Sequence, residues 1–301
     1  AADEEAGGTY GAKWLSENVP QKIRTDYALN EGSGSPLIID GKLAYTIAVG
    51  EKGRSIAKID VRGQAAHAGQ PWLGKNAIQQ LAEVVTRICS YTPQIDTSLV
   101  FFEQVARLLE LEEPITQENL DEIANTLLTT QKDLSSTLRA LSRMTMSATL
   151  ISGGTKSNII PDTASLTCDI RTLPNQSEAY VEEKMGMIID NLEDVVVDVE
   201  HTAASSMSPP DSSFVNHVKQ ATEIALGQDN INWIQSIARG FTDSRFVRQI
   251  GADAYGFAPL TPDSDPVRRF HGVDEAMEID NLIFRTKMQV VLAYLLMGPT
   301  E

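Results

Sequence analysis

Two neighbouring carboxylates, Glu4 and Glu5, stand near the start of the sequence in the segment Ala2-Asp3-Glu4-Glu5-Ala6-Gly7-Gly8. Adjacent side chains outside a helix diverge, so one carboxylate can bind a metal ion while the other faces a water molecule as a general base. Paired acidic residues ahead of a helix are also common as a solvated first turn that the helix dipole favours. Further groups must therefore converge on the pair before it indicates a site.

Glu31 and His271 are the candidates for that convergence. Glu31 lies in a turn rich in Gly and Ser after the apolar stretch 27–29, and α/β sheets present ligands beyond their strand ends. His271 precedes the last predicted helix, and the carboxylates of Asp274 and Glu275 can orient its imidazole. Each residue alone is equally compatible with an ordinary surface turn.

A second set of polar residues points to substrate binding. His67 lies among small residues between a predicted strand and a predicted helix, where it could stabilise an oxyanion or simply cap the turn. Arg171 shares a strand face with Asp169, as half of a surface ion pair or as a bidentate clamp for a carboxylate. Asn158 ends the stretch 153–158, which lacks the spacing of a phosphate loop and better suits hydrogen bonding to an amide or carboxylate.

The hydrophobic pattern divides the chain into two domains that would position these residues. Residues 55–205 read as strand, helix, polar helical insertion, two strands, helix and strand, which is the ferredoxin-like order. Residues 1–54 and 206–301 alternate helices with strands, and Ser208-Pro209-Pro210 reads as a linker. We therefore expect an α/β domain built from 1–54 and 206–301, interrupted by a small α+β domain at 55–205.

The individual elements follow from the same pattern. Asn175, with Glu178 three residues later, predicts the start of one helix. Predicted helices cover about 9–17, 78–88, 117–141, 181–192, 213–226 and 280–297, with a short one after Asp243. Predicted strands cover about 37–39, 43–49, 57–61, 146–150, 164–170, 195–199, 231–237 and 252–257.

The overall composition limits the number of domains, the classes of binding partner and the cellular compartment. The 301 residues, 42% of them hydrophobic, suffice for one large or two moderate domains. A net charge of -16 repels phosphate backbones and anionic membranes, so neither nucleic acid nor a membrane is expected as a partner. Cys89 and Cys168 fall on apolar faces of predicted elements. We therefore expect two buried thiols in a reducing compartment, which makes the protein cytoplasmic.

Together these residues resemble the two-zinc metallohydrolase family of aminoacylase, acetylornithine deacetylase, succinyl-diaminopimelate desuccinylase and glutamate carboxypeptidase. The resemblance covers essentially the whole sequence but only the C-terminal part of a typical member. Its most specific motif is Gly154-x-x-x-Asn158-x-Ile160-Pro161 followed by Asp169-x-Arg171. The other motifs are Asp3-Glu4-Glu5-x-Gly7-Gly8, Asn30-Glu31-Gly32, the histidine turn 63–71 followed by Gly74-Lys75-Asn76-Ala77, and the loop 240–245.

The resemblance implies a zinc-exopeptidase-like catalytic domain interrupted by a ferredoxin-like lid or dimerisation domain. Glu4 would be the general base, and Glu5, Glu31 and His271 would bind metal, with two zinc ions per complete subunit and cobalt or manganese as alternatives. His67 would polarise the scissile carbonyl, usually from the opposite subunit of a homodimer formed through the inserted domain. Substrate binding would fall to Asn158 and Arg171 at its carboxylate end and to Gly240 and Thr242 on a loop beside it.

The implied activity is metal-dependent hydrolysis of the amide bond of N-acyl amino acids or small peptides with a free carboxylate. A dipeptidase or aminopeptidase that reads a free amine is the alternative enzyme, and a non-catalytic dimerising or binding module is the alternative class. Family members carry a His-x-Asp motif and a metal-bridging Asp that would precede Ala1. We therefore expect an N-terminally truncated member that binds metal weakly and is inactive as given.

Overall fold

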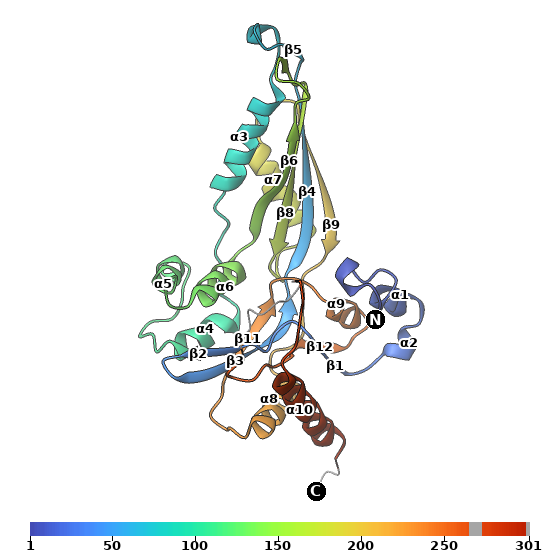
Figure 1. Cartoon of the computed structure of the whole chain (residues 1–301), viewed down its shortest axis with the longest axis vertical. Helices are drawn as coiled ribbons and strands as arrows, with labels where there is room; N and C mark the ends of the chain where they lie inside the picture. Colours follow the sequence, from blue (N-terminus) through green and yellow to red (C-terminus); the bar gives the residue numbers. More distant parts are fainter. Residues whose placement is uncertain (265–272, 299–301) are drawn as a thin grey trace. The chain divides into compact units, whose positions relative to one another are not determined.

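The computed structural model describes residues 1–264 and 273–298 (Figure 1). The chain forms two compact units, which we call unit 1 and unit 2. The segment 97–123, which the sequence pattern placed within the inserted domain, groups with unit 1. The domain boundaries expected from the sequence stay a prediction. Unit 1 comprises 1–51, 97–123 and 206–301, and unit 2 comprises 52–96 and 124–205.

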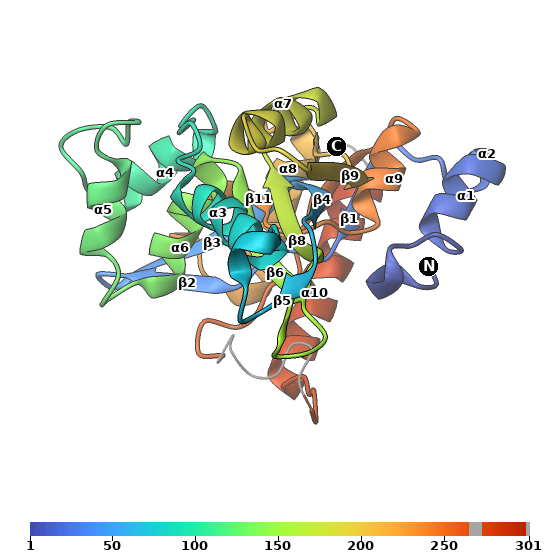
Figure 2. The ribbon, with the colours of Figure 1, turned by 90° about the horizontal axis from the view of Figure 1, so that it is seen from above.

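Unit 2 is built on a four-stranded antiparallel sheet in the order β6-β8-β4-β9. Buried and solvent-facing residues alternate along β4 (Gly53–Arg62), so the sheet has one apolar face. The helices α3 (Ala77–Ser90) and α7 (Glu178–Ile189) both cover that face and share its core (Figure 2). The remaining strands are β6 (Thr145–Gly153), β8 (Thr163–Thr172) and β9 (Val195–Ala203). The ferredoxin-like order expected from the sequence is confirmed.

Two smaller features complete unit 2. A short ladder between β5 (Ala66–His67) and β7 (Ile159–Ile160) follows the ends of the longer strands. The polar helical region expected at 117–141 is two helices: α6 (Lys132–Ser142) lies in unit 2, and α5 (Leu120–Thr126) runs across the boundary between residues 123 and 124. Lys52 is 1% exposed and donates to the carbonyls of Ala140 at 2.6 Å and Arg143 at 2.9 Å. This buried lysine therefore caps the C-terminal end of α6.

Unit 1 is organised around the long apolar strand β3 (Lys42–Glu51), which pairs with four other strands of a six-stranded sheet. The turn Asp40-Gly41, with φ of 48° and 77°, joins β2 (Pro36–Ile39) to β3 as an antiparallel hairpin, and both strands were predicted. β1 (Tyr27–Asn30) lies at the edge, parallel to β12. The other strands are β10 (Ser206–Met207), β11 (Asn232–Ala238) and β12 (Asp253–Gly256).

Helices surround this sheet within unit 1. α8 (Ser213–Leu226) and α10 (Ile279–Met297) pack on each other (Figure 1). Phe214 of α8 stacks on Tyr27 and Tyr255. α4 (Val100–Leu108), which was not assigned bounds of its own from the sequence, packs against β11. The remaining helices are α1 (Ala12–Asn18), α2 (Pro20–Ile23) and α9 (Ser244–Gln249). Among the residues described, no helix combines the length and the apolar character needed to cross a membrane.

Two expectations from the sequence are wrong. Cys89 is exposed, because the buried stripe of α3 runs through Ala77, Leu81, Val84 and Ile88 and turns the next residue outward. Cys168 is buried as expected, and both thiols are free. Ser177, not Asn175, caps α7: its side chain accepts from the backbone N–H of Tyr180, while Asn175 donates to Asp96.

Candidate active site

The segment that carries Glu4 and Glu5 is folded back by its two glycines. Glu4–Ala6 form one turn of 3-10 helix, and Gly7 and Gly8 follow with φ of 98° and 69°. Only glycine adopts such angles without strain. A Cβ on Gly8 would collide with the side chain of Asp243, so this turn lies against the loop that precedes α9.

Arg245 ties the two loops together. Its Nη2 donates to the carbonyl of Gly7 at 2.8 Å, and its guanidinium lies 4.0 Å and 4.5 Å from the ring centroids of Phe241 and Phe246. The residue is 7% exposed. A buried cation stacked between two aromatic rings is held rigidly, so the carbonyl that it contacts is held as well.

Glu5 and Glu31, the two carboxylates predicted to bind metal, lie within electrostatic range of Glu4 in unit 1. Burial raises the pKa of the half-buried Glu4, and the negative charges of Glu31, Glu5 and Asp243 raise it further, while Arg245 opposes them. Charges influence one another in this way only at short range. Glu4 and its neighbour Glu5 therefore form one acidic cluster with Glu31, which is distant in the sequence, and we call it the Glu4 cluster.

Glu31 is positioned by the end of the β1–β12 ladder. Asn30 is paired with Gly256, and the backbone N–H of Phe257 donates to the carbonyl of Asn30 at 2.7 Å. A Cβ on Gly256 would collide with the carbonyl oxygen of Glu31. Glycine at position 256 is therefore required for the backbone of Glu31 to follow β1 in this conformation.

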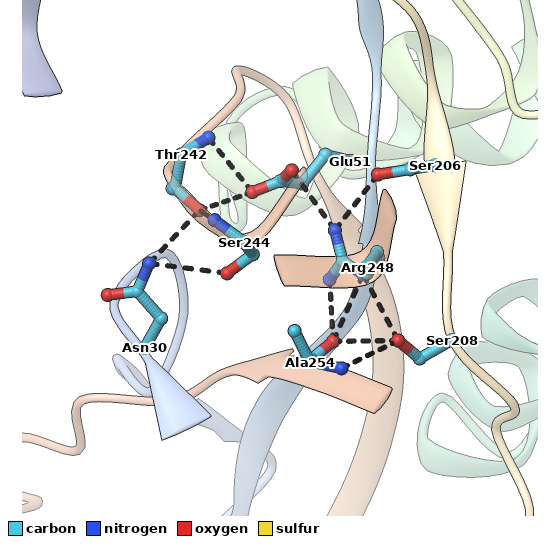
Figure 3. A network of polar contacts seen from close by, with 8 residues as sticks. All are labelled: Asn30, Glu51, Ser206, Ser208, Thr242, Ser244, Arg248 and Ala254. Carbon is cyan, nitrogen blue, oxygen red and sulfur yellow. Dashed lines mark hydrogen bonds and ion pairs between the residues drawn. The ribbon is translucent and has the colours of Figure 1, made fainter. Parts of the chain in front are cut away.

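A buried polar network lies beside this turn, in a place that the sequence analysis did not anticipate (Figure 3). Glu51, at the end of β3, accepts from Arg248 Nη1 at 3.0 Å through one oxygen and from the backbone N–H and hydroxyl of Thr242 through the other. Burial raises the pKa of the Glu51 carboxyl, although Thr242 and Arg248 oppose that shift. A charged residue closing an otherwise apolar strand was the signal in the sequence.

Thr242 and Gly240 were predicted to lie beside the substrate. Both donors of Thr242 are directed at Glu51, so this residue is tied into the network. Gly240 is half-buried and has open space on the side where a Cβ would stand. Their contact with a substrate stays a prediction.

In unit 2, His67 and Asn158 lie next to each other. His67 is paired with Ile159 in the β5–β7 ladder, and the N–H of Ala68 donates to the carbonyl of Asn158 at 2.9 Å. His67 Nδ1 accepts from the N–H of Gly69 at 3.1 Å, which leaves Nε2 as the nitrogen that can face a partner. Both side chains are exposed.

Arg171 lies at the far end of β8. It is paired with Arg54 on β4, whereas Thr163, at the other end of β8, is paired with Arg62 near the His67 turn. Eight residues of strand at about 3.3 Å each separate these two ends by roughly 25 Å. The structure therefore brings His67 and Asn158 together but keeps Arg171 away from both.

The predicted partner of Arg171 is confirmed. Arg171 Nε donates to Asp169 Oδ1 at 2.6 Å, and Arg54 Nε donates to Asp169 Oδ2 at 2.8 Å. Burial would raise the pKa of Asp169, but the hydrogen bonds from Arg171 and Arg54 outweigh it and leave the pKa lowered. A single carboxylate thus pairs with two guanidinium groups.

The donors of the Glu4 cluster have the right chemistry for a divalent cation, since carboxylate oxygens bind Mg²⁺, Mn²⁺ and Zn²⁺. Their mutual repulsion is what a bound cation would relieve. Within residues 1–264 and 273–298, no group of three or more His, Cys, Asp or Glu side chains has a geometry that could hold a metal ion. His271, the predicted imidazole ligand, lies outside the described residues.

Comparison with known proteins places this arrangement in a class. Residues 49–195 match the family model of the peptidase dimerisation domain of M20 peptidases. The N-fatty-acyl-amino acid synthase/hydrolase PM20D1 of Xenopus tropicalis is 26% identical over 293 residues, which cover 91% of this chain and 54% of that protein. A probable succinyl-diaminopimelate desuccinylase of Staphylococcus aureus is 26% identical over 233 residues, which cover 76% of this chain and 52% of that protein.

Solved structures agree on the fold. An M20 family metallo-carboxypeptidase from Sulfolobus solfataricus matches with a TM-score of 0.64 at 17% identity. The match covers 96% of this chain and 68% of the carboxypeptidase. The dipeptidase Dug1p from Saccharomyces cerevisiae has a TM-score of 0.63 at 16% identity, with coverages of 99% and 65%. The expected zinc-exopeptidase-like fold with an inserted ferredoxin-like domain is confirmed.

The chain thus contains a peptidase dimerisation domain within an α/β fold. It is similar to M20 metallopeptidases and to proteins named as a desuccinylase and an N-fatty-acyl-amino acid synthase/hydrolase, so the resemblance inferred from the sequence is confirmed. The name of that family implies dependence on a metal. The chain spans about half the length of the curated relatives it matches.

Proposed function

We propose that the protein carrying this chain is a metal-dependent amidohydrolase that removes an acyl group, or a terminal residue, from a small substrate with a free carboxylate. The observation that carries this proposal is the Glu4 cluster: Glu4, Glu5 and Glu31 come close enough for their charges to raise the pKa of Glu4. A group of like charges is costly unless a cation neutralises it. The similarity of this chain to M20 deacylases and carboxypeptidases supports the same reaction.

Glu5 and Glu31 would hold the metal, together with His271, and two zinc ions per complete subunit are our first choice, with cobalt or manganese as alternatives. When bound, a divalent cation acts as a Lewis acid and makes water nucleophilic at neutral pH. The raised pKa of Glu4 makes its carboxylate a stronger proton acceptor. Glu4 would take the proton of the attacking water and return it to the leaving amine.

On the substrate side, His67 would stabilise the oxyanion, and Arg171 and Asn158 would bind the substrate carboxylate. A small substrate cannot bridge the length of β8 that separates Arg171 from Asn158 within one chain. The pairing of β5 with β7 obliges whichever subunit lends His67 to lend Asn158 as well. We therefore propose a homodimer, formed through unit 2, in which each active site uses His67 and Asn158 of the second subunit.

The two free thiols and the absence of a disulfide among the described cysteines are consistent with our proposal of a reducing, cytoplasmic location.

The test is a substrate panel on the complete protein, loaded in turn with zinc, cobalt and manganese. N-acetylated amino acids and unblocked dipeptides are compared as substrates. A deacylase or carboxypeptidase would require the free carboxylate of the substrate. The same compound with that carboxylate converted to an amide would be hydrolysed poorly. Faster turnover of unblocked dipeptides would favour a dipeptidase instead. A complete protein that binds none of the three metals and cleaves neither class would overturn the proposal in favour of a binding module.

A further inference from the structure

The network around Glu51 joins segments of unit 1 that are distant in the sequence: the end of β3, the start of β10 and the stretch from Thr242 to Ala254. Arg248 of α9 holds the far side of Glu51 and is itself fixed by the hydroxyl of Ser206 at 3.0 Å and the carbonyl of Ala254 at 2.6 Å (Figure 3). The side chains of Glu51 and Arg248 are 4% and 7% exposed. The carboxylate is thus anchored on a rigid frame made by the strands of the sheet.

Stability alone does not explain why such a pair stands here. Moving two charges out of water costs several kcal/mol per ion, which their attraction offsets only partly. An apolar pair of similar volume is often equally stable or more stable. What a buried carboxylate supplies, and an apolar side chain cannot, is a fixed direction for the hydrogen bonds of its neighbours.

The directions of those hydrogen bonds can be followed from Glu51 outward. The hydroxyl of Thr242 has a single hydrogen, and it is donated to the carboxylate, which cannot donate in return. The oxygen of Thr242 must therefore accept from its other neighbours, the N–H of Ser244 at 3.1 Å and Nδ2 of Asn30 at 3.3 Å. Nδ2 of Asn30 also donates to the hydroxyl of Ser244 at 3.2 Å.

Asn30 is the residue that immediately precedes Glu31. Its side chain is oriented by Thr242 and Ser244, and its carbonyl accepts from Phe257 on the opposite side of the strand. The turn that carries the Glu31 carboxylate is therefore held from both sides. One of these restraints leads, through Thr242, to Glu51.

We propose that Glu51 is a positioning residue of the active site: acting through the Thr242 hydroxyl and the Asn30 amide, it holds the turn that presents Glu31 to the metal. This inference rests on the proposed function, because it assumes that Glu31 is a ligand. Both carboxylate oxygens of Glu51 accept hydrogen bonds from Thr242 and Arg248, so its effect on Glu31 would be indirect. Outer partners of this kind typically change metal affinity or activity by about 10- to 100-fold when they are removed.

The matched substitutions are Thr242→Val, which removes the hydroxyl at nearly constant volume, and Thr242→Ser, which keeps it. Zinc affinity of the complete protein is measured by competition with a chelating dye, and steady-state kinetics give kcat and KM separately. Thr242→Val and Glu51→Gln should each weaken zinc binding by about 10-fold or more. Thr242→Ser should retain most of the zinc affinity, because the oriented hydroxyl remains.

Thr222→Val is the control for a general effect of removing a buried hydroxyl. Thr222 is 0% exposed and its hydroxyl donates to the carbonyl of Val218 within α8, away from this network. Its variant should bind zinc as the wild type does, whatever its stability. The double variant Glu51→Gln/Thr242→Val should be no weaker in zinc binding than the worse single variant, because both break one chain of contacts.

Folded Thr242→Val protein with unchanged zinc affinity would overturn the positioning role, and this arm remains available if Glu51→Gln does not fold. A change confined to KM would also overturn it, because Thr242 would then contact the substrate directly. These results differ from failure of the proposed function itself, in which the wild-type protein would bind no zinc. In that case both proposals fall together.

Discussion

His67 and Asn158 are held side by side, because the β5–β7 ladder pairs His67 with Ile159 and the N–H of Ala68 donates to the carbonyl of Asn158. Neither can be moved without the other. Arg171 lies at the opposite end of the same sheet. The predicted substrate-binding residues therefore fall into two groups that one chain cannot bring to the same small molecule.

Mixing inactive variants tests this grouping. Dimers that combine a His67→Ala subunit with a Glu4→Gln subunit should regain one intact active site. A random equal mixture should then recover about a quarter of wild-type activity, since half of its C2 dimers are mixed and each has one working site. Asn158→Ala mixed with Arg171→Leu should recover activity in the same way. The measurement is hydrolysis of an N-acetylated amino acid after subunit exchange.

The matched control is a mixture of His67→Ala with Asn158→Ala. Both residues come from the same subunit in our account, so neither site of a mixed dimer is intact. Recovery of activity by this mixture would contradict the grouping.

Gly256 provides a test of how Glu31 is placed. In Gly256→Ala the new methyl group collides with the carbonyl of Glu31, so the turn must shift. We expect the zinc affinity of the complete protein to fall by about 10-fold or more, as for other losses of ligand orientation. Zinc titration of the purified variant gives the answer.

Gly186→Ala is its control. Gly186 is an exposed residue of α7 with open space around it, so alanine should be tolerated and should stabilise the helix by up to about 1 kcal/mol. Equal zinc affinity of the two glycine variants would show that metal binding does not depend on the close approach of Gly256 to Glu31.

The sequence predicted the elements well because their hydrophobic periods are regular. The alternation of Ala57, Ile59 and Val61 is found as β4, and the order of elements from 55 to 205 is found as the ferredoxin-like sheet. The bounds of the α4 helix were not predicted, because its apolar residues Phe101, Phe102 and Val105 are buried against a part of the chain distant in sequence. Tertiary contacts, not local propensity, define that helix.

The site was predictable only in part. Motif spacing identified Glu4, Glu5 and Glu31, and the structure brings their charges together. The partners that fix them were not predictable, since Glu51 and Arg248 are ordinary charged residues until folding buries them beside each other. The distance between Arg171 and Asn158 likewise depends on strand register, which the motif does not contain.

Lys52 makes the folding stability of unit 2 depend on pH in the neutral to alkaline range. Burial, assisted by the charge of Arg171, lowers the pKa of Lys52 to about 7 from 10.5. Between these values the unfolded chain binds a proton that the folded chain has released, so stability rises with pH across this window and is lost as pH falls towards 7. The slope is on the order of 1 kcal/mol per pH unit.

Lys52→Met should remove that slope, because the variant has no proton to release. The comparison is urea unfolding of wild type and variant at several pH values across the same window. The variant should gain most over the wild type at the low end and lose that advantage towards the high end. Parallel pH profiles for the two proteins would contradict the assignment of the proton to Lys52.

The central claim is that Glu4 acts on the water and Glu5 and Glu31 hold the metal. Its most direct test is the Glu4→Gln variant of the complete protein, in which metal content by mass spectrometry and hydrolysis of an N-acetylated amino acid are measured on the same sample. We predict metal content equal to that of the wild type and no hydrolysis above trace level. Turnover comparable to the wild type in the metal-loaded variant would contradict the account.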